Sequence, residues 1–571
     1  MYTNGLHMPI PWRLKIMTYS ELFTHIELFA GIGAATTAAA MAGIELNTIA
    51  ISEIDQFPLK LRKLIHPACK AKNIGDLTAY GWTNEQFHDT DIVSGGFPCQ
   101  SFSQMGKMKG WNCPDTIRIT SALRDFVVFF LPKYVILENV TAVFNKSNKA
   151  GTDQFLSSFL NDYNMDKTFH NPHDDGYMQS RTRAWIVLSR KDVPQWKIGK
   201  FYPLSKAQTW GDVKDSRILK DDLKGEYFHA KATARLSSKR ANKHWSISDN
   251  STMFQCILKR SVCARCNRAS WIENKGYHRS PTTNEFFRLF GYEKFPKQLT
   301  KKDKTLSRSA IARGFGNSWH VGAASQIFDM FPSYELEEWK FEQFIKQFIH
   351  VDAIESLSKK MTAKNIRLHY PWDVLMTTAH GSPRKIRATS SHKFDMKNGM
   401  KVETQGAYLA PADEASDPSK GIYINTCAMH GECKDGCLRF TGHLALHGHS
   451  LVRVHKTLAF YAYPMRFVTQ MITEVIEGAE KADSRGDSYI FRGNGTTDIL
   501  WERFIKIDKL VDAIKGLTMF YDYTKMGRAR LSNLPSSYHL TFSVDEKKNT
   551  IKDAHAYLKA GYSVAVVMPD K

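Results

Sequence analysis

The chain of 571 residues is 43% hydrophobic and 24% charged, which excludes a largely disordered protein and is too long for one ordinary core. Its 78 Lys and Arg exceed its 57 Asp and Glu by 21 charges, so we expect a polyanionic partner such as a nucleic acid. No apolar run approaches the roughly 18 residues of a membrane helix and no signal-peptide pattern opens the chain, so we expect a soluble protein that stays inside the cell.

Short apolar runs alternate with helix-length stretches over residues 24–189, behind an N-terminal extension of residues 1–23. The runs are HIELFAG, NTIAISEID, TDIVSGGFP, KYVILENV and RAWIVLS, and each ends in polar residues or glycine. This alternation predicts an α/β domain with a mostly parallel sheet. Because ligands bind at the carboxyl ends of such strands, functional residues are expected just after the runs.

Residues 190–275 form a basic insert with little periodicity. Between Arg190 and Arg279 there are 20 Lys or Arg against 8 Asp or Glu, so this segment is the expected nucleic-acid surface. A helical pattern returns over residues 276–332 and completes the first unit. Residues 333–403 are Lys-rich and mixed in pattern, and we interpret them as a helical connector.

Residues 404–571 change pattern again. Four strand-like runs, YIFRGNGTTDILW, TMFYDYTK, SSYHLTFSVD and YSVAVVMPD, are separated by helix-length segments. They predict a second α/β domain, for which a barrel-like arrangement of the strands is one form.

The segment Phe29-Ala30-Gly31-Ile32-Gly33-Ala34 follows the first apolar run and opens an Ala-rich helix, with Glu53 about twenty residues further on. Glycine at such a turn lets the backbone approach a nucleoside, and an acid after the second strand can hold ribose hydroxyls. By itself this pattern fits a tight strand-to-helix turn with surface acids equally well.

Cys99 lies in the loop GGFPCQSFS, directly after the apolar run DIVS. A loop at a strand end can present a thiolate to a pocket, and proline and glycine fix the backbone that aims it. Most single cysteines are inert small hydrophobes, so the neighbouring motifs decide the interpretation. Two of these are LENV, which ends the next apolar run, and QSRTR, which precedes another.

In this order FAGIGA, GGFPCQSFS, LENV, QSRTR and GFGNS resemble the motif set of the cytosine-5 methyltransferase family. The resemblance covers roughly residues 24–332, and residues 190–275 lie where that family carries its target-recognition domain. It implies a Rossmann-like, S-adenosylmethionine-dependent enzyme that methylates carbon 5 of cytosine in duplex DNA on a base turned out of the helix. We expect it to act as a monomer.

The resemblance also implies roles for individual catalytic residues. Cys99 would add to carbon 6 of cytosine, which makes carbon 5 nucleophilic toward the methyl group. Glu138 would hold the ring N3 and the exocyclic amine. Arg183, together with Arg181 and Gln179, would face the base carbonyl and the loop that carries Cys99.

The resemblance implies one S-adenosylmethionine site formed by several loops. The residues that match the family's cofactor contacts are Phe29, Gly31, Ile32, Gly33, Glu53, Asp76, Pro98, Asn317 and Ser318. Two positions depart from the family pattern, because Phe290 stands where the family has a polar side chain and Trp319 follows the final Gly-Asn-Ser. The first departure puts the target preference in doubt and neither touches the catalytic residues.

Two other functions remain open at this level. One branch of the same family methylates tRNA with the same Cys and Glu, although the sizeable basic insert favours DNA. A DNA-binding relative that has lost turnover is the second alternative. The presence of Cys99, Glu138, Arg183 and the cofactor loop argues against it.

Two groups of cysteines have spacings that metal sites use, and all nine cysteines are expected to be reduced. Cys256, Cys263 and Cys266 are candidate zinc ligands if a histidine completes the set, and three packed thiols are the alternative. In the second domain Cys427, Cys433 and Cys437 are candidate ligands of an iron–sulfur cluster or of zinc, and three cysteines without a metal are the alternative.

The second domain as a whole resembles an uncharacterised domain of phage proteins. This resemblance implies a viral or mobile-element source. The expected location is then the cytoplasm of a bacterial host or of a phage-infected cell.

Overall fold

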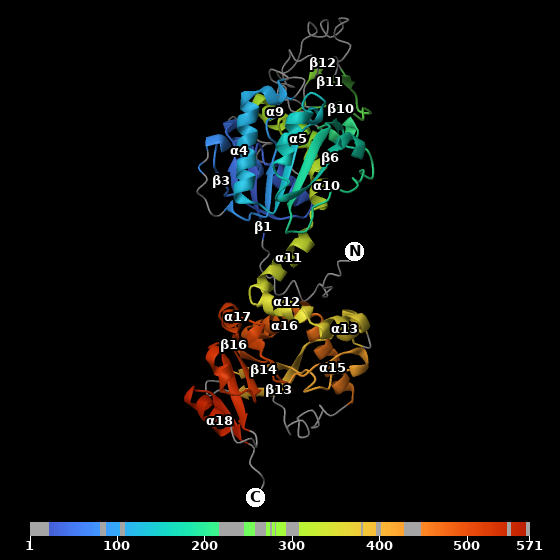
Figure 1. Cartoon of the computed structure of the whole chain (residues 1–571). Coiled ribbons are helices and arrows are strands. Elements are labelled where there is room, and N and C mark those ends of the chain that lie inside the picture. The colour runs from blue at the N-terminus through green and yellow to red at the C-terminus, as the bar shows by residue number, and fades with distance from the viewer. Residues whose placement is uncertain are drawn as a thin grey trace. The chain divides into compact units, whose positions relative to one another are not determined.

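The computed structural model describes residues 22–79, 81, 87–102, 109–215, 245–256, 270–274, 277–279, 281–292, 308–378, 381–395, 401–427, 447–544 and 550–566. Contacts divide the chain into a first unit, residues 21–339, and a second unit that begins at residue 340. Figure 1 shows the elements of each unit. Within the described ranges no helix is both long enough and apolar enough to cross a membrane.

The first unit is built on a seven-stranded sheet in the order β3-β2-β1-β4-β5-β8-β6. Its strands are β1 (Phe23–Leu28), β2 (Leu46–Ser52), β3 (Lys72–Asn73), β4 (Ile92–Gly95), β5 (Tyr134–Val140), β6 (Tyr163–His170) and β8 (Arg183–Arg190). The first five run parallel, and β8 runs antiparallel to both β5 and β6. The predicted Rossmann-like α/β fold is therefore confirmed.

Helices cover both faces of this sheet because side chains of the central strands alternate between two hydrophobic clusters. In β5, Tyr134 and Ile136 belong to one cluster, and Val135 and Leu137 belong to the other. The first cluster includes residues of α2 (Ala34–Met41), α3 (Gln56–Ile65) and α10 (Val321–Asp329), and the second includes residues of α4 (Pro114–Phe130) and α5 (Lys149–Ser157). Burial on both faces explains why the central strands read as continuous apolar runs.

The strand order reverses between β1 and β4, which lie side by side at the centre of the sheet. Each is followed by a loop at its carboxyl end, residues 29–33 after β1 and residues 96–99 after β4. Such a reversal leaves a crevice at the carboxyl edge of an α/β sheet, where ligands bind. The topology thus brings the two loops that carry the main sequence motifs to one place.

The beginning of the predicted insert packs into the first unit. Val193, Trp196, Trp210 and Val213 are buried in the same cluster as Ile136, so the beginning of the insert contributes side chains to the core of this unit. At the far end of the insert, Thr282 donates a hydrogen bond to Asp215 over 2.6 Å, and Arg288 pairs with the same carboxylate at 2.8 Å. Asp215 therefore connects the early part of the insert to the residues that follow the insert.

The insert also returns to the sheet region through one short pair of strands. Residues Phe254–Gln255 form β10, which pairs in parallel with β7 (Gln179–Ser180). Three further short strands form a separate small sheet, namely β9 (Trp245–Ile247), β11 (Ser270–Asn274) and β12 (Tyr277–Arg279). Two helices, α8 (Thr283–Leu289) and α9 (Arg308–Gly316), follow the insert.

The second unit contains a six-stranded sheet in the order β13-β14-β15-β16-β17-β18. The strands are β13 (Arg387–Asp395), β14 (Lys401–Ala407), β15 (Ser488–Arg492), β16 (Leu517–Thr524), β17 (Tyr538–Val544) and β18 (Ser563–Val566). From β14 to β18 they run parallel in chain order, and β13 is antiparallel. The second α/β domain is confirmed, but the barrel-like form is wrong, because β13 and β18 are the two edges of an open sheet among the described strands.

Helices from the expected connector contribute to the core of this second unit. Its helices are α12 (Val351–Lys359), α13 (Met361–His369), α14 (Trp372–Met376), α15 (His447–Ala462), α16 (Pro464–Asp483), α17 (Ile507–Ala513) and α18 (Thr550–Lys559), and α11 (Ser333–Lys346) crosses the boundary between the units. Ile354, Ile366 and Leu375 are almost fully buried in the same cluster as residues of β15 and α16. Residues 351–376 are therefore an integral part of the second unit.

Candidate active site

The predicted site residues gather at the carboxyl edge of the first unit's sheet. The cofactor loop follows β1, Glu53 follows β2, Asp76 lies three residues after β3, and Cys99 follows β4. Glu138 lies near the end of β5, where Glu138 and Val140 pair with Trp185 and Arg183 at the beginning of β8. Because β8 is antiparallel, its first residues lie at the same edge as the last residues of β5.

The cofactor loop has the backbone geometry that its glycines predict. Phe29, Gly31 and Gly33 all have positive φ angles, of 52°, 52° and 85°. A β-carbon on Gly33 would lie 2.6 Å from the His66 ring and 2.7 Å from a terminal nitrogen of Arg62, and the positive φ strains any other residue there. The amide of Gly31 donates a hydrogen bond of 2.8 Å to the Glu53 carboxylate, which holds this acid against the tip of the loop.

Asn73 positions both acids of the predicted cofactor site, and the sequence analysis missed it. Its side-chain oxygen accepts from the amides of Glu53 and Gly75, each at 3.1 Å, and its side-chain nitrogen donates to the Glu53 carbonyl. Asp76 follows directly and is exposed. Hydrogen bonds from the Thr78 amide and hydroxyl lower the pKa of Asp76, which favours an ionised acceptor.

A buried ion pair supports the cofactor loop from below. Glu27, in β1, accepts from Arg62 over 2.5 Å, and both side chains are about 4% exposed. Glu27 also accepts from the Ala35 amide at the start of α2. Burial acts to raise the pKa of Glu27, but the charges of Arg62 and His25 outweigh it and lower that pKa.

We expect Glu27→Gln to destabilise the first unit by about 3–5 kcal/mol, because it leaves the buried Arg62 charge without its carboxylate. Urea denaturation of the full chain, followed through the first unit's transition, measures this loss. The matched control is Asp153→Asn, which removes an exposed ion pair with Lys149 and is expected to cost at most about 1 kcal/mol. Equal effects of the two substitutions would contradict the supporting role of Glu27.

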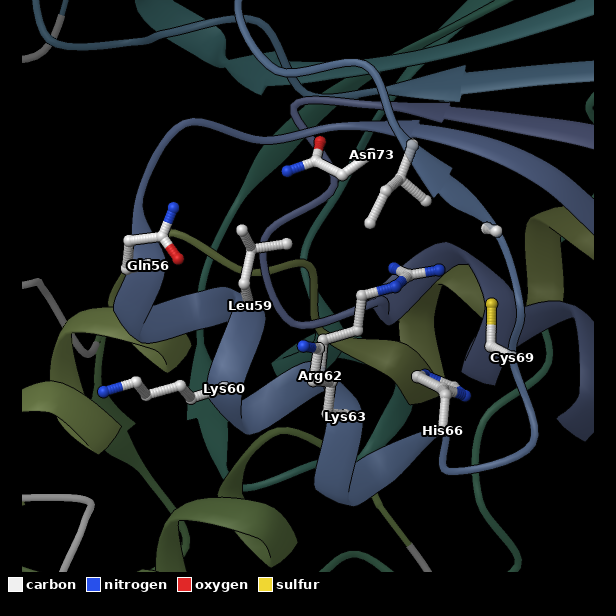
Figure 2. A pocket seen from close by; sticks show the side chains of 10 residues that line it. Gln56, Leu59, Lys60, Arg62, Lys63, His66, Cys69 and Asn73 are labelled. Atoms are coloured by element: carbon white, nitrogen blue, oxygen red, sulfur yellow. The ribbon is translucent and has the colours of Figure 1, made fainter.

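Figure 2 shows a hollow of about 450 Å³ that lies beside this support. It is lined by Ile51, Gln56, Leu59, Lys60, Arg62, Lys63, His66, Cys69, Ala71 and Asn73. None of the predicted site residues lines it, although His66 contacts the Gly33 carbonyl over 2.9 Å. The hollow is thus adjacent to the cofactor loop and separate from Cys99.

Two neighbours fix the loop that carries Cys99. Asn139 donates a side-chain hydrogen bond of 2.9 Å to the Phe97 carbonyl, which ties the loop to β5. A β-carbon on Gly96 would lie 3.2 Å from a carboxylate oxygen of Glu138 and 3.0 Å from the Trp319 indole nitrogen. Glycine at position 96 therefore lets Glu138 lie directly against the Cys99 loop.

Cys99 is partly buried, and burial together with the Glu138 charge raises the pKa of its thiol. The nearby Arg183 and Arg181 act in the opposite direction without cancelling that effect. The thiol form therefore predominates at neutral pH before a substrate is bound. A cysteine in this environment has to lose its proton before its sulfur can act as a nucleophile.

We expect alkylation of Cys99 by iodoacetamide to accelerate about tenfold per pH unit through the neutral range, because the thiolate fraction rises with pH until the raised pKa is reached. Peptide mass spectrometry of timed samples measures the rate. Cys113 is the control, because hydrogen bonding with Ser101 lowers the pKa of its thiol and its rate is expected to level off at lower pH. Parallel pH profiles for the two cysteines would contradict this prediction.

Glu138 and Arg183 form an ion pair in which Arg183 Nε lies 2.8 Å from a carboxylate oxygen. Burial raises the pKa of Glu138, against the opposing charges of Arg183 and Arg181. Arg181 donates to the Ser318 carbonyl over 2.7 Å, and Gln179 donates to the Leu289 carbonyl over 2.7 Å. The QSRTR segment thus connects the carboxyl edge of the sheet to the end of α8, at Leu289, and to the GFGNS motif, at Ser318.

The two departures from the family pattern have structural explanations. The Arg181 guanidinium lies over the Phe290 ring at 5.4 Å from its centre, so an aromatic side chain supports the arginine there. Trp319 packs edge-on against Trp185 with 5.0 Å between ring centres, and its indole faces Gly96. Of the predicted cofactor contacts, Asn317 is exposed and Ser318 is buried.

Comparison with known proteins agrees with this arrangement. The family model described as C-5 cytosine-specific DNA methylase matches residues 23–331, which is more than half of the chain. The chain belongs to this family. The family that the sequence motifs predicted is therefore confirmed.

The curated proteins that the chain resembles include methyltransferases of phages and bacteria. An orphan methyltransferase of Bacillus phage SPbeta, M.SPBetaI, is 27% identical over 212 residues, which cover 31% of this chain and 47% of the relative. The type II methyltransferase M.HgiCII of Herpetosiphon aurantiacus is 33% identical over 217 residues, 36% of this chain and 48% of the relative. The chain spans about half the length of these curated relatives.

Solved structures of methyltransferases resemble the chain at low identity. The crystal structure of S. pombe Dnmt2 methyltransferase is 18% identical with a TM-score of 0.44, and the match covers 54% of this chain and 97% of that one. The methyltransferase EhMeth of Entamoeba histolytica is 17% identical with a TM-score of 0.45 over 54% of this chain and 98% of that one. A second family model, Gene product 88, matches residues 380–571 and agrees with the predicted phage-type domain.

Cys256 has an environment that differs from the one expected of a zinc ligand. Arg181 donates to its sulfur over 3.3 Å and Arg183 over 3.8 Å. Two guanidinium groups beside the sulfur oppose the binding of a cation. Cys263 and Cys266 lie outside the described residues, so the zinc prediction for the three together stays untested.

The candidate metal site of the second unit is also only partly described. Cys427 lies 3.8 Å from the Thr496 carbonyl, in the loop region that follows β14 and β15. Cys433 and Cys437 lie outside the described residues. Over the part of the chain that the structure describes, no three His, Cys, Asp or Glu side chains are grouped to hold a metal ion.

Proposed function

We propose that this chain transfers a methyl group from S-adenosylmethionine to carbon 5 of cytosine in duplex DNA. The observation that carries the proposal is the grouping of Cys99, Glu138 and Arg183 at one strand edge, where Glu138 contacts Arg183 and its charge reaches the Cys99 thiol. The loop of residues 29–33 and the two acids Glu53 and Asp76, which fit a nucleoside cofactor, lie at the same edge. The names of the relatives, which include orphan and type II methyltransferases, support the same reaction class.

The residues present fit S-adenosylmethionine. The loop of residues 29–33 leaves open space around Gly31, whose added β-carbon would meet only the Phe29 carbonyl at 3.9 Å. The two oxygens of Glu53 each accept one backbone amide and keep further acceptor capacity for ribose hydroxyls. Asp76 is an exposed carboxylate that would accept from the adenine amine. When bound, S-adenosylmethionine supplies the methyl group.

The chemistry begins at Cys99. Its sulfur adds to carbon 6 of the cytosine and its proton leaves, so that carbon 5 gains the electron density needed to accept the methyl group. Loss of the proton from carbon 5 then expels the sulfur and restores the aromatic ring. The rigid Cys99 loop, tied through Asn139 and Gly96, holds the sulfur at a fixed place beside Glu138.

Glu138 acts on the opposite edge of the same base. Burial raises the pKa of Glu138, so its carboxylate, paired with Arg183 before the base binds, is suited to share a proton with the ring N3 as the sulfur adds. Arg183, held against Glu138, is suited to bind the base carbonyl. Protonation at N3 and a cation at the carbonyl both stabilise the electron-rich ring of the adduct.

Duplex DNA is the proposed substrate because the reaction needs a base out of the helix and the insert carries a strong positive charge. Residues 190–279 hold 20 basic residues against 8 acidic ones, which favours contact with the phosphate backbone. Turning the base out of the stack would bring carbon 6 within reach of the Cys99 sulfur.

The test compares methyl transfer from labelled S-adenosylmethionine to duplex DNA and to tRNA with the full chain. Transfer to duplex DNA, with 5-methylcytosine as the product after nucleoside digestion, is the expected result. Transfer to tRNA alone would replace the proposed substrate with the RNA alternative. Label on adenine, or no transfer to either nucleic acid, would overturn the proposed function.

A further inference from the structure

Cys256 reaches the catalytic edge through a short strand pair. In the parallel pair of β10 and β7, Phe254 lies opposite Gln179 and Gln255 lies opposite Ser180. The Phe254 amide donates to the Met178 carbonyl over 2.7 Å, and its ring is buried. Cys256 follows directly after β10, and Arg181 follows directly after β7. The insert thus presents its cysteine to QSRTR at a fixed register.

The sulfur of Cys256 contacts both arginines of that segment. Arg181 Nη1 donates to it over 3.3 Å and Arg183 Nη2 donates to it over 3.8 Å. Through its Nε, Arg183 is also paired with Glu138 at 2.8 Å. One sulfur and one carboxylate therefore hold the same guanidinium from two directions.

The charges around this contact favour an anionic sulfur. Arg181 is 3% exposed and the Arg183 side chain is 14% exposed, so two cations are placed in a largely dry site. Although burial acts to raise the pKa of Cys256, the charges and hydrogen bonds of Arg181 and Arg183 lower it. In Cys99 the balance is the reverse, because burial and Glu138 raise the thiol's pKa. The same two arginines therefore lie near two cysteines whose pKa values are shifted in opposite directions.

We propose that Cys256 is a positioning residue for methyl transfer, whose sulfur holds Arg181 and Arg183 in the orientation that Glu138 and the target base require. This role rests on the proposed function, since it concerns the same site. It means that the reaction centre is complete only when the DNA-reading insert is seated through β10. Insert and catalytic edge are then coupled by one side chain.

The test uses three substitutions in the full chain. Cys256→Ala removes the acceptor, Cys256→Ser keeps a neutral acceptor, and Cys256→Asp restores a compact anion. We expect the single-turnover methyl transfer rate at saturating S-adenosylmethionine to fall at least about tenfold in Cys256→Ala and to be largely rescued in Cys256→Asp, with Cys256→Ser between them. The affinity for S-adenosylmethionine is expected to stay near that of the unmodified chain, because Cys256 is not among the predicted cofactor contacts.

Two outcomes would overturn the positioning role. The first is a wild-type single-turnover rate in Cys256→Ala. The second is an equal loss in Cys256→Ala and Cys256→Asp, which would show that the side chain matters for packing and not for its negative acceptor.

A second measurement does not depend on activity. The ultraviolet absorbance of thiolates is titrated with pH in Cys99→Ser and in the double variant Cys99→Ser/Cys256→Ser. The difference between the two curves reports Cys256 alone. We expect it to show a thiol whose pKa is lower than that of an ordinary cysteine. A difference curve with an ordinary or raised pKa would overturn the anionic contact. If the unmodified chain methylates nothing, this titration still decides the contact while the proposed function fails separately.

Discussion

Replacing Cys99 with serine is expected to reduce methyl transfer to duplex DNA by about 10³-fold or more. The serine hydroxyl is far less acidic than a thiol and is a poor nucleophile at the partly buried position between Glu138 and the arginines. Single-turnover transfer of labelled methyl groups measures the rate. The same substitution is expected to abolish the covalent complex with DNA that a thiolate adduct allows.

The control for this substitution is Cys69→Ser. Cys69 is exposed and belongs neither to the Cys99 loop nor to the predicted cofactor contacts, so its replacement is expected to leave the rate unchanged. Calorimetry with S-adenosylmethionine should give the same affinity for both variants, because neither residue belongs to the predicted cofactor contacts. Substantial transfer by Cys99→Ser would mean that another group forms the bond to carbon 6.

Glu138→Gln is expected to slow methyl transfer by about 10²–10⁴-fold, which is the range for loss of a positioned acid or base. A glutamine keeps a similar shape and can still donate to N3, but it cannot transfer a proton. It also leaves Arg183 without its carboxylate in a nearly buried place. The measurement is the single-turnover rate at several pH values.

The shape of that pH profile separates the two roles of Glu138. If the carboxyl group gives a proton to N3, the limb of the profile that reports its raised pKa disappears in Glu138→Gln. Asp153→Asn is again a suitable control, because it changes one exposed carboxylate that pairs with Lys149 and not with Arg183. An unchanged profile at a reduced rate would assign Glu138 to holding Arg183 alone.

The sequence predicts most of the first unit because its signals are local. The runs that become β1, β2, β4, β5 and β8 are mostly apolar, and the polar residues at or after their ends place Glu53, Cys99 and Glu138 at one edge. Positive φ at Gly31 and Gly33 is predictable because glycine adopts this conformation more readily than other residues. In such cases each residue's role depends on its neighbours in the chain.

The contacts that escaped the sequence join residues far apart in the chain. Asn73 binds the loop of Glu53 across twenty residues, and Cys256 meets Arg181 across seventy-five, and no periodicity marks either pair. The cysteine spacing in the insert pointed to zinc because spacing says nothing about the guanidinium groups that the fold brings to Cys256. The apolar pattern of residues 351–376 likewise could not show which core those helices would join.

Asp215 binds both Thr282 and Arg288, so the intervening segment, residues 216–281, begins and ends at neighbouring points of the first unit. Since the ends are held together by side chains outside residues 216–281, the length between them can vary at a small entropic cost, about 0.6 kcal/mol for each doubling. We therefore expect a change in the length of this segment to leave the first unit's sheet intact as long as the Asp215 contacts are kept. A transplanted insert would still have to bring an acceptor to the position of Cys256, which sets a simple rule for designing chimaeras.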